Sequence, residues 1–465
     1  MNKIDVHAPL LFDLPFTADP ARLDQPGVGL AKVLSLAGRD ASYAADITLL
    51  DVADHRLIRS GVELAHRVIE GRGDWYLRAP QWRPMLPDEQ LEPFARGDLP
   101  DDLADLVLPF RRRGALGPVA AISYQRQSFE FRSADGLALA RLQDSRITVR
   151  RGGVTTARYR EVRIEPAEAG LTPDQQDWLI AALVGAGGTR VQEFPELAGR
   201  LGTPATGLTD YPEPRPIEPD SSFESFVESV LAARLRELIM ADLSARTGTP
   251  VKTGVGEVAA RLRGELNGLA ATLDPDWLAE LDEELRWLLA EVAESGAEPA
   301  RLRSLLRRER YLRLLDLLVT AVRGPRVDEN IADLGAGDTV TGLLDHSCDK
   351  LIEIAGGLSE DAAPADWMAA AIAAEETARI DRLAALVASK KERRTGRRLR
   401  PAIKLLLDSQ TDAERADAAQ RQARFATPAD AFELGRDYQR RRQSQHEAER
   451  EFLQTWPAIV RKVHR

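Results

Sequence analysis

The feature that most constrains the fold of this chain is a proline-rich stretch at residues 204–221, because the hydrophobic pattern changes across it. Residues 1–203 contain short runs of alternating apolar and polar side chains with turn signals between them, which is typical of strands. From residue 222 onward, apolar residues recur every three or four positions, the period of an amphipathic helix. The sequence therefore predicts domains at 1–203 and 222–465, joined by a stiff, extended linker at 204–221.

The pattern of the first domain favours an antiparallel barrel or sandwich. Asp135-Gly136 and Arg151-Gly152-Gly153 are predicted to be hairpin turns. A helix is predicted over Pro173–Val184, with Thr172 as its N-cap. The strand predicted at Tyr159–Glu165 would direct three alternate side chains to one face: Arg160, Val162 and Ile164.

In the second domain, the stretch Asp274–Leu318 predicts two amphipathic helices. The first begins at Pro275, since proline is tolerated where the helical N–H would be unpaired anyway. Its apolar stripe comprises Leu278, Leu281, Leu285, Leu288 and Leu289. The second helix runs on from Arg301 and places one set of residues towards the core, Leu302, Leu305 and Leu306, and another set on a different side, Arg303, Arg307 and Arg310.

Composition narrows the class of protein. The net charge of −10 argues against a protein that coats nucleic acid or that binds it sequence-specifically. It does not exclude a local polyanion site. The sequence lacks an apolar run long enough to span a bilayer and lacks a signal-peptide pattern. The single cysteine, Cys348, cannot form an intramolecular disulfide, and with His346 and Asp349 it does not complete a four-ligand metal site. We therefore expect a cytoplasmic protein without a membrane partner.

Particular phrases in both domains resemble known families. In the second domain they are Asp274-Pro275-Asp276-Trp277, Glu284-Leu285-Arg286-Trp287-Leu288 and Arg310–Asp316, which resemble the CHAD family, an all-helical domain associated with inorganic polyphosphate. In the first domain they are Asp51–Gly61, Gly61–Arg67, Trp75–Pro80 and Tyr159–Glu165, which resemble the CYTH family of antiparallel β-barrels with a triphosphate tunnel. The resemblance implies an α+β multidomain protein, with a CYTH-like barrel before a CHAD-like helical bundle.

The CYTH resemblance also implies a site. In that family basic side chains hold phosphate oxygens and carboxylates hold a divalent metal. By resemblance, the anion-binding residues would be Arg67, Arg78 and Arg126. The carboxylates that would balance them, or hold Mg²⁺ or Mn²⁺ if the barrel is active, would be Asp144, Glu161 and Glu165.

Several positions depart from the CYTH pattern. The opening ExExK strand would correspond to Lys3, Asp5 and His7, in which a base replaces the first acid and an imidazole replaces the lysine. On the closing strand, Arg163 stands where the middle acid is expected, and a cation there would repel a divalent metal. These departures favour a salt-bridged interior without turnover, so we expect a chain that is not an enzyme, and Mg²⁺ or Mn²⁺ is expected only if the barrel is active.

The CHAD resemblance implies basic helices that converge on a chain of phosphates, which is recognised through charge spacing and counterion release. In Thr253–Arg263, which resembles the first CHAD signature, Arg261 and Arg263 remain. In Trp367–Arg379, which resembles the second, Glu375-Glu376 replaces a Lys-Arg pair. The contacts that the family makes to phosphate are therefore reduced in number.

A conspicuous basic run spans Lys390–Arg400. Gly396 interrupts its helical pattern and Pro401 follows, which predicts an exposed corner where a new helix starts. The run could be a solvated helix end, a docking patch for an acidic protein surface or a polyanion site. The candidate polyanion-binding residues of this domain are Arg261, Arg263, Arg303, Arg307, Lys390, Lys391, Arg393, Arg394, Arg397, Arg398 and Arg400.

Three functions stay open from the sequence. The first is a non-catalytic CYTH–CHAD-like protein that binds inorganic polyphosphate weakly, with polyphosphate granules as the implied location, or that binds an unidentified protein. The second is a Mg²⁺- or Mn²⁺-dependent triphosphatase acting on inorganic triphosphate or a triphosphorylated small molecule. The third is a structural or assembly role through oligomerisation of the bundle.

Overall fold

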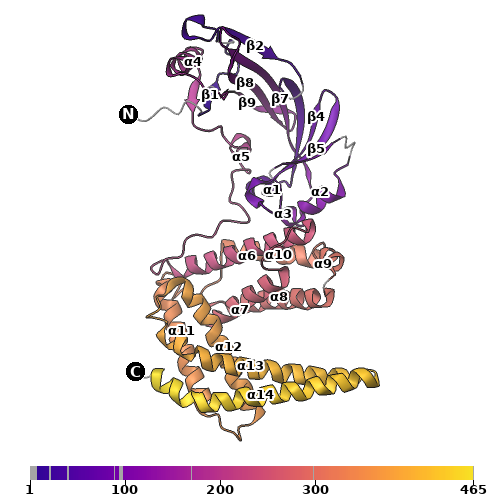
Figure 1. Ribbon diagram of the computed structural model, residues 1–465, viewed down its shortest axis with the longest axis vertical. Helices are drawn as coiled ribbons and strands as arrows, with labels where there is room; N and C mark the ends of the chain where they lie inside the picture. The colour runs from indigo at the N-terminus through magenta and orange to yellow at the C-terminus, as the bar shows by residue number, and fades with distance from the viewer. Residues whose placement is uncertain are drawn as a thin grey trace. The chain divides into compact units, whose positions relative to one another are not determined.

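The computed structural model describes residues 8–19, 22–38, 41–87, 89–93, 98–168, 170–296 and 298–463. The chain divides into two compact units. Unit 1 comprises Met1–Pro212, Asp242–Val251 and Arg307–Arg313, and unit 2 comprises Glu213–Ala241, Lys252–Leu306 and Leu314–Arg465. An antiparallel sheet forms the N-terminal part and helices form the C-terminal part (Figure 1). The predicted fold class, an α+β chain with an antiparallel β domain before an all-α domain, is confirmed at this level.

Unit 1 is built on a ten-stranded sheet in which every ladder is antiparallel. The strand order is β10-β1-β9-β8-β7-β3-β4-β5-β6, and β2 pairs with β7 beside this path. The strands are β1 (Leu10–Leu14), β2 (Lys32–Leu36), β3 (Tyr43–Asp51), β4 (Glu63–Ile69), β5 (Arg72–Arg78), β6 (Glu89–Pro93), β7 (Gly117–Arg132), β8 (Ala138–Arg151), β9 (Val154–Pro166) and β10 (Thr189–Val191). Both predicted hairpin turns connect neighbouring strands, β7 to β8 and β8 to β9.

The alternation predicted along β9 is confirmed and sets the two faces of the sheet. Arg160, Val162 and Ile164 are buried, at 2%, 2% and 0% exposure, whereas the intervening side chains are more accessible. The buried face carries an apolar core that packs against α4 (Pro173–Gly185). Thr172 caps α4 as predicted, since its hydroxyl accepts a hydrogen bond from the Gln175 amide at 3.3 Å.

Short helices complete unit 1: α1 (Arg56–Arg59), α2 (Asp101–Leu106), α3 (Leu108–Arg111) and α5 (Leu197–Leu201). The proline-rich stretch at 204–221 contains no helix or strand. Its first part is nevertheless packed, because Tyr211 is 2% exposed and its ring contacts those of Trp82 and Phe110. The neighbouring Asp210 accepts a buried hydrogen bond from Arg112, so residues around 210 are anchored and are not a free spacer.

The described part of unit 2 is built mainly from helices, as the sequence predicts. The helices of the C-terminal part of the chain are α6 (Phe223–Thr247), α7 (Val255–Gly268), α8 (Pro275–Ser295), α9 (Pro299–Leu305), α10 (Glu309–Arg323), α11 (Ala336–Gly356), α12 (Pro364–Val387), α13 (Arg394–Ala423) and α14 (Pro428–Val463). Asp274 caps α8, accepting from the Trp277 amide at 2.8 Å. The second helix predicted in Asp274–Leu318 is in fact two, α9 and α10, because the helix ends before Leu306–Arg308.

The helix predicted to start near Pro401 begins earlier, at Arg394, and continues through both Gly396 and Pro401. Gly396 is buried, and a Cβ there would lie 3.2 Å from Leu344 Cδ1 and 3.4 Å from Asp381 Oδ1. The glycine therefore permits close packing and does not interrupt the helix. Pro401 lies on the exposed side, where the loss of one backbone hydrogen bond is tolerated by a helix of 30 residues.

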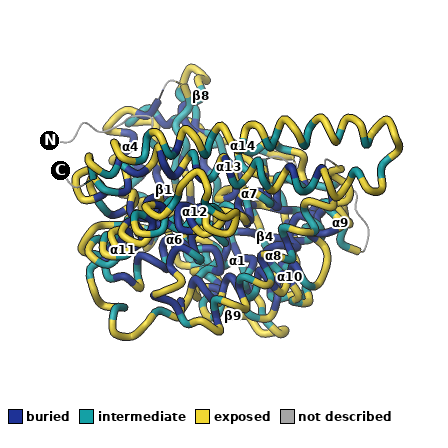
Figure 2. The backbone as a smooth tube through the Cα atoms, turned by 90° about the horizontal axis from the view of Figure 1, so that it is seen from below, coloured by how far each residue is buried: buried dark blue, intermediate teal, exposed yellow. Residues whose placement is uncertain are grey.

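The helices α13 and α14 form a long antiparallel pair (Figure 1). Exposed and half-buried residues predominate along α14 in Figure 2, which agrees with its having only Phe452 and Ile459 buried among its described residues. Within the described ranges, no helix combines the length and the apolar content needed to cross a membrane.

Candidate functional site

Three predicted anion-binding residues line one cavity on the face of the sheet opposite the α4 core. Arg67 on β4, Arg78 on β5 and Arg126 on β7 surround a space of about 600 Å³, together with Glu161 on β9 and Arg200 on α5. The ladder register explains this arrangement, because Ile47 of β3 pairs with Arg67 on one side and with Ile122 of β7 on the other. Alternation along each strand then projects these arginines to the same face.

Two of the three arginines are already matched by carboxylates. Arg67 pairs with Asp74 at 3.1 Å, and Arg78 pairs with Glu63 at 3.1 Å. Desolvation lowers the pKa of Arg67, but the hydrogen bond and charge of Asp74 together with the charge of Glu89 outweigh that effect, and the net pKa is raised. Burial raises the pKa of Glu63, against the opposing charge of Arg78. Both cations are therefore held in internal pairs.

Arg126 is different, because it has no carboxylate partner among the described residues. Its Nε donates to the Tyr124 hydroxyl at 2.9 Å, and its guanidinium lies 5.5 Å and 5.3 Å from the ring centroids of Tyr43 and Tyr124. Burial raises the pKa of Tyr43, so this phenol stays neutral near pH 7. Arg126 is thus the cation in this cavity that an anion could engage without first breaking an ion pair.

The three predicted metal-binding carboxylates do not share a site, so that interpretation is corrected. Asp144 pairs across the ladder with Val162, whereas Ser145 pairs with Glu161, which places Asp144 and Glu161 on opposite faces of the sheet. Each carboxylate also has an arginine partner: Asp144 with Arg160 at 2.7 Å, Glu165 with Arg163 at 2.8 Å, and Glu161 with Arg200.

Other predicted features give no metal centre either. Lys3, Asp5 and His7 lie outside the described residues. In the ranges that are described, no three His, Cys, Asp or Glu side chains are grouped to hold a metal ion. Cys348 is fully buried, and this burial raises the pKa of its thiol to about 12, so it is an unreactive core residue near neutral pH.

Outside the basic run, most of the candidate cations of the helical region are also paired with carboxylates. Arg261 pairs with Glu237 at 3.2 Å and Arg263 pairs with Asp282 at 2.6 Å. Arg307 belongs to unit 1, where it pairs with Asp105 at 2.7 Å. Of this group, Arg303 on α9 is the residue without a carboxylate partner in the described chain.

Within the basic run Lys390–Arg400, two arginines share one buried carboxylate, although only Arg393 is itself buried. Arg393 and Arg400 both pair with the buried carboxylate of Asp381, at 3.2 Å and 2.8 Å. The Arg393 side chain is only 10% exposed and that of Asp381 is 7% exposed. These two candidates are therefore structural ion-pair partners and not free phosphate ligands.

The other cations of the run lie on the surface, without carboxylate partners in the described chain. Arg398 donates to the main-chain oxygen of Lys462, which brings the last turn of α14 beside the first turn of α13. We call the resulting surface the basic corner; it comprises Lys390, Lys391, Arg394, Arg397, Arg398, Arg461 and Lys462. Sequence reasoning missed Arg461 and Lys462, and the signal that could have found them is the antiparallel pairing of two long amphipathic helices.

Like charges are crowded at the basic corner. Slight burial and the charge of Arg394 lower the pKa of Arg398. The one nearby acid of the run, Glu392, is held by its own backbone, since its carboxylate accepts from the Ser389 amide at 2.7 Å. The local field is therefore positive although the whole chain carries a net charge of −10.

No family model matches the chain. Two uncharacterised proteins of Mycobacterium tuberculosis, MT2285 of strain CDC 1551 / Oshkosh and Rv2226 of strain ATCC 25618 / H37Rv, are each 25% identical to it over 332 residues. That match covers 68% of this chain and 62% of each relative, which is less than two thirds of the relatives' own length.

Three solved structures show limited similarity. The CHAD domain of the plant Ricinus communis is 15% identical with a TM-score of 0.39, over 54% of this chain and 96% of that domain. PptA from Streptomyces chartreusis is 18% identical with a TM-score of 0.36, over 51% and 100%. The Bacillus halodurans protein bh2851 is 14% identical with a TM-score of 0.20, over 37% and 95%. At these scores the similarities carry no argument about what this chain does.

Proposed function

We propose that this chain binds a phosphate-rich polyanion at the basic corner and does not hydrolyse it. The observation that carries the proposal is the contrast in charge matching: the seven cations of the basic corner have no carboxylate partners in the described chain, whereas most other candidate cations do. Inorganic polyphosphate is the ligand that the sequence resemblance implies. Its repeated charges suit several exposed cations on one surface.

The position of the basic corner on α13 supports the proposal. The first turn of α13 contains no acidic residue and carries Arg394 and Arg397. Cations are unfavourable there because the helix dipole is positive at its N-terminus. A bound polyanion would reverse that penalty, since it would neutralise both the side chains and the exposed end of the dipole.

The test is binding of fluorescently labelled long-chain polyphosphate to the full chain at two salt concentrations. Affinity should fall steeply as salt rises, because each neutralised phosphate releases a counterion. The double substitution Arg394→Glu with Arg397→Glu should weaken binding by about tenfold or more and flatten the salt dependence. The matched control is Arg421→Glu with Arg424→Glu at the other end of α13, where affinity should stay close to that of the parent protein.

The outcomes separate the proposal from its main alternative. Absence of polyphosphate binding by the parent protein at low salt would refute it and would favour the alternative, a docking surface for an acidic protein. Equal loss of affinity in both double variants would also refute it, because binding would then follow total charge and not this surface.

The proposed lack of hydrolysis rests on the engaged state of the carboxylates. Glu161 is paired with Arg200, and Asp144 lies on the other face of the sheet with Arg160. Incubation of the full chain with inorganic triphosphate and Mg²⁺ or Mn²⁺ should therefore release no phosphate above a protein-free control. Release that Glu161→Ala abolishes would overturn this part of the proposal and restore the triphosphatase alternative.

A further inference from the structure

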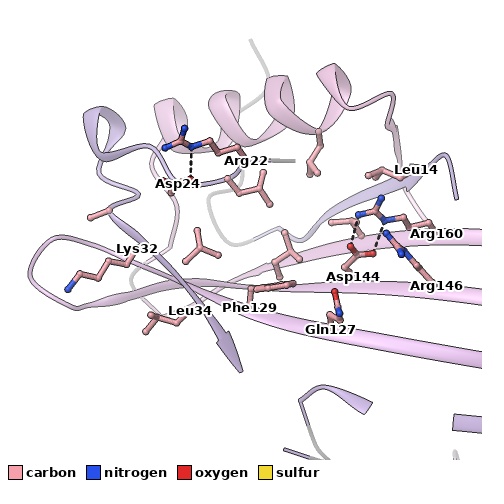
Figure 3. A pocket seen from close by; sticks show the side chains of 16 residues that line it. Leu14, Arg22, Asp24, Lys32, Leu34, Gln127, Phe129, Asp144, Arg146 and Arg160 are labelled. Atoms are coloured by element: carbon pink, nitrogen blue, oxygen red, sulfur yellow. Dashed lines mark hydrogen bonds and ion pairs between the residues drawn. The ribbon is translucent and has the colours of Figure 1, made fainter. Parts of the chain in front are cut away.

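A second pocket lies on the α4 side of the sheet, away from the arginine-lined cavity. It has a volume of about 490 Å³ and is lined by β1, β2 and the segment before it, strands β7, β8 and β9, and α4 (Figure 3). This volume lies within the range of small-molecule sites in proteins. None of the residues predicted to bind phosphate lines this pocket, and of the predicted metal-binding carboxylates only Asp144 does.

Apolar side chains form a little over half of the walls of this pocket. Several lining residues belong to the buried core of unit 1 or pack against it: Leu14, Leu23, Val33, Phe129, Leu142, Val162 and Leu183. Leu34, which also lines the pocket, is 41% exposed. Apolar walls open to solvent favour an apolar occupant, because water there lacks hydrogen-bond partners.

Polar groups gather at one part of the pocket. Arg160 is 2% exposed and donates two hydrogen bonds to Asp144, at 3.0 Å and 2.7 Å. Arg146 pairs with Arg160 across the β8–β9 ladder, and Figure 3 shows it beside that ion pair, with Gln127 nearby. The guanidinium groups of Arg146 and Arg160 are thus adjacent, and the Asp144 carboxylate neutralises only that of Arg160.

Arg146 is partly buried and has no carboxylate partner in the described chain. The other lining cations are Arg22, which pairs with Asp24 at 3.2 Å, and Lys32, which Figure 3 places well away from Arg146. The pocket therefore combines a positive end with a long apolar surface. That combination fits a ligand that is charged at one end only.

We propose that this pocket binds a small amphiphilic anion, meaning an acyl or alkyl chain of medium length with a carboxylate or phosphate head. The head group contacts Arg146, and Gln127 provides a further hydrogen bond. The chain lies against Phe129, Leu142 and Val33. A neutral alcohol of the same length leaves Arg146 without its counter-charge, and a bare polyphosphate gains nothing from the apolar walls, so neither matches the pocket.

Calorimetric titration of the full chain with decanoate, decyl phosphate and 1-decanol, each below its aggregation limit, tests this proposal. We expect one site per chain, and at least one anion should bind about tenfold tighter than decanol, which corresponds to about 1.4 kcal/mol. Comparison of decanoate with decyl phosphate identifies the preferred head group. Arg146→Gln should remove most of the anion's advantage and leave decanol binding unchanged.

Two further variants keep the test decisive. Arg150→Gln changes an exposed arginine on the same strand that does not line the pocket, and it should bind like the parent protein. Ala31→Phe places a ring into the pocket and should weaken binding of all three probes. The proposal is overturned if neither anion binds the parent protein, or if Arg146→Gln and Ala31→Phe both bind as the parent does.

Discussion

The two sides of the basic run Lys390–Arg400 place the same kinds of side chain in opposite electrostatic situations. On the inner side, the buried Arg393 pairs with the buried carboxylate of Asp381, which also holds the more exposed Arg400. On the outer side, Arg394 and Arg397 face solvent without carboxylate partners in the described chain. The helical period alone does not divide them, because Arg397 lies four positions after Arg393 and three before Arg400; the position of Asp381 on the neighbouring helix α12 does. In a run of positive charge, therefore, only the cations that have no internal carboxylate partner indicate a binding surface.

The largest expected effect comes from breaking the inner side. Asp381→Ala would leave Arg393, whose side chain is 10% exposed, as a nearly buried cation without its counter-ion. We expect the free energy of unfolding to fall by about 3 kcal/mol, the usual cost of removing one partner of a buried pair. Denaturant unfolding of the full chain measures this change.

The control for Asp381→Ala is Glu375→Ala, which removes the exposed partner of Arg379 on the same helix, α12. Because surface ion pairs contribute little, that variant should lose less than about 1 kcal/mol. Similar losses in the two variants would contradict the distinction between inner and outer cations.

A buried aspartate in unit 1, Asp51, can be compared with Asp381, because its described partners are backbone amides and not arginines. Asp51 is 1% exposed, and among the described residues its carboxylate accepts only from the backbone amides of Val52, Leu57 and Ile58. Burial raises the pKa of Asp51 to about 6, although the three amide hydrogen bonds oppose the shift. The three amide hydrogen bonds therefore stabilise the ionised carboxylate by less than burial destabilises it.

This raised pKa predicts a pH dependence with a definite sign. The folded protein retains the Asp51 proton up to about pH 6, whereas the unfolded chain loses it near the ordinary value of 3.8. The contribution of Asp51 to stability is therefore present below pH 3.8 and is lost as the pH rises through 6. Between pH 4 and pH 7 the parent protein should lose about 2 kcal/mol relative to Asp51→Asn.

Urea unfolding of both proteins across that pH range measures the difference. Asp54→Asn serves as the contrast. Although burial opposes it, the hydrogen bond from Arg56 lowers the pKa of Asp54, so its contribution changes only at more acid pH. A constant difference between the parent protein and Asp51→Asn from pH 4 to pH 7 would contradict the assignment.

Local features were predictable from the sequence because they depend on neighbouring residues. Thr172 caps α4, β9 alternates as expected, and the C-terminal part of the chain is helical. Charge matching was not predictable, since Asp381 meets Arg393 and Arg400 from 12 and 19 positions away in the sequence. Those pairings depend on how the helices pack, which no local pattern specifies.

The predicted metal set failed for a related reason. Whether Asp144 and Glu161 share a face depends on the β8–β9 register, and a difference of one residue moves a side chain to the other face. By contrast, Arg67 and Arg78 lie in segments that resemble CYTH strands, and each needed only the alternation of its own strand to reach the cavity that Arg126 also lines. Gly396 was predicted to interrupt a helix but lies inside α13, because tight packing can require a glycine within a helix.

The smallest expected effect concerns the stability of the outer side. Arg394→Glu with Arg397→Glu places two acids in the first turn of α13, where the helix dipole favours negative charge. We expect a gain of about 0.5 to 1 kcal/mol at low salt, reduced at high salt by screening. The control pair Arg421→Glu with Arg424→Glu lies at the C-terminal end of α13 and should lose a similar amount, because the dipole has the opposite sign there.

Thermal unfolding at two salt concentrations measures both changes. A variant that becomes more stable while it loses polyphosphate affinity cannot owe that loss to misfolding, so the two experiments together separate binding from folding. A loss of stability in Arg394→Glu with Arg397→Glu would show that these arginines support the fold. The outer side would then resemble the inner side, and the basic corner would no longer be a surface whose cations are free for a ligand.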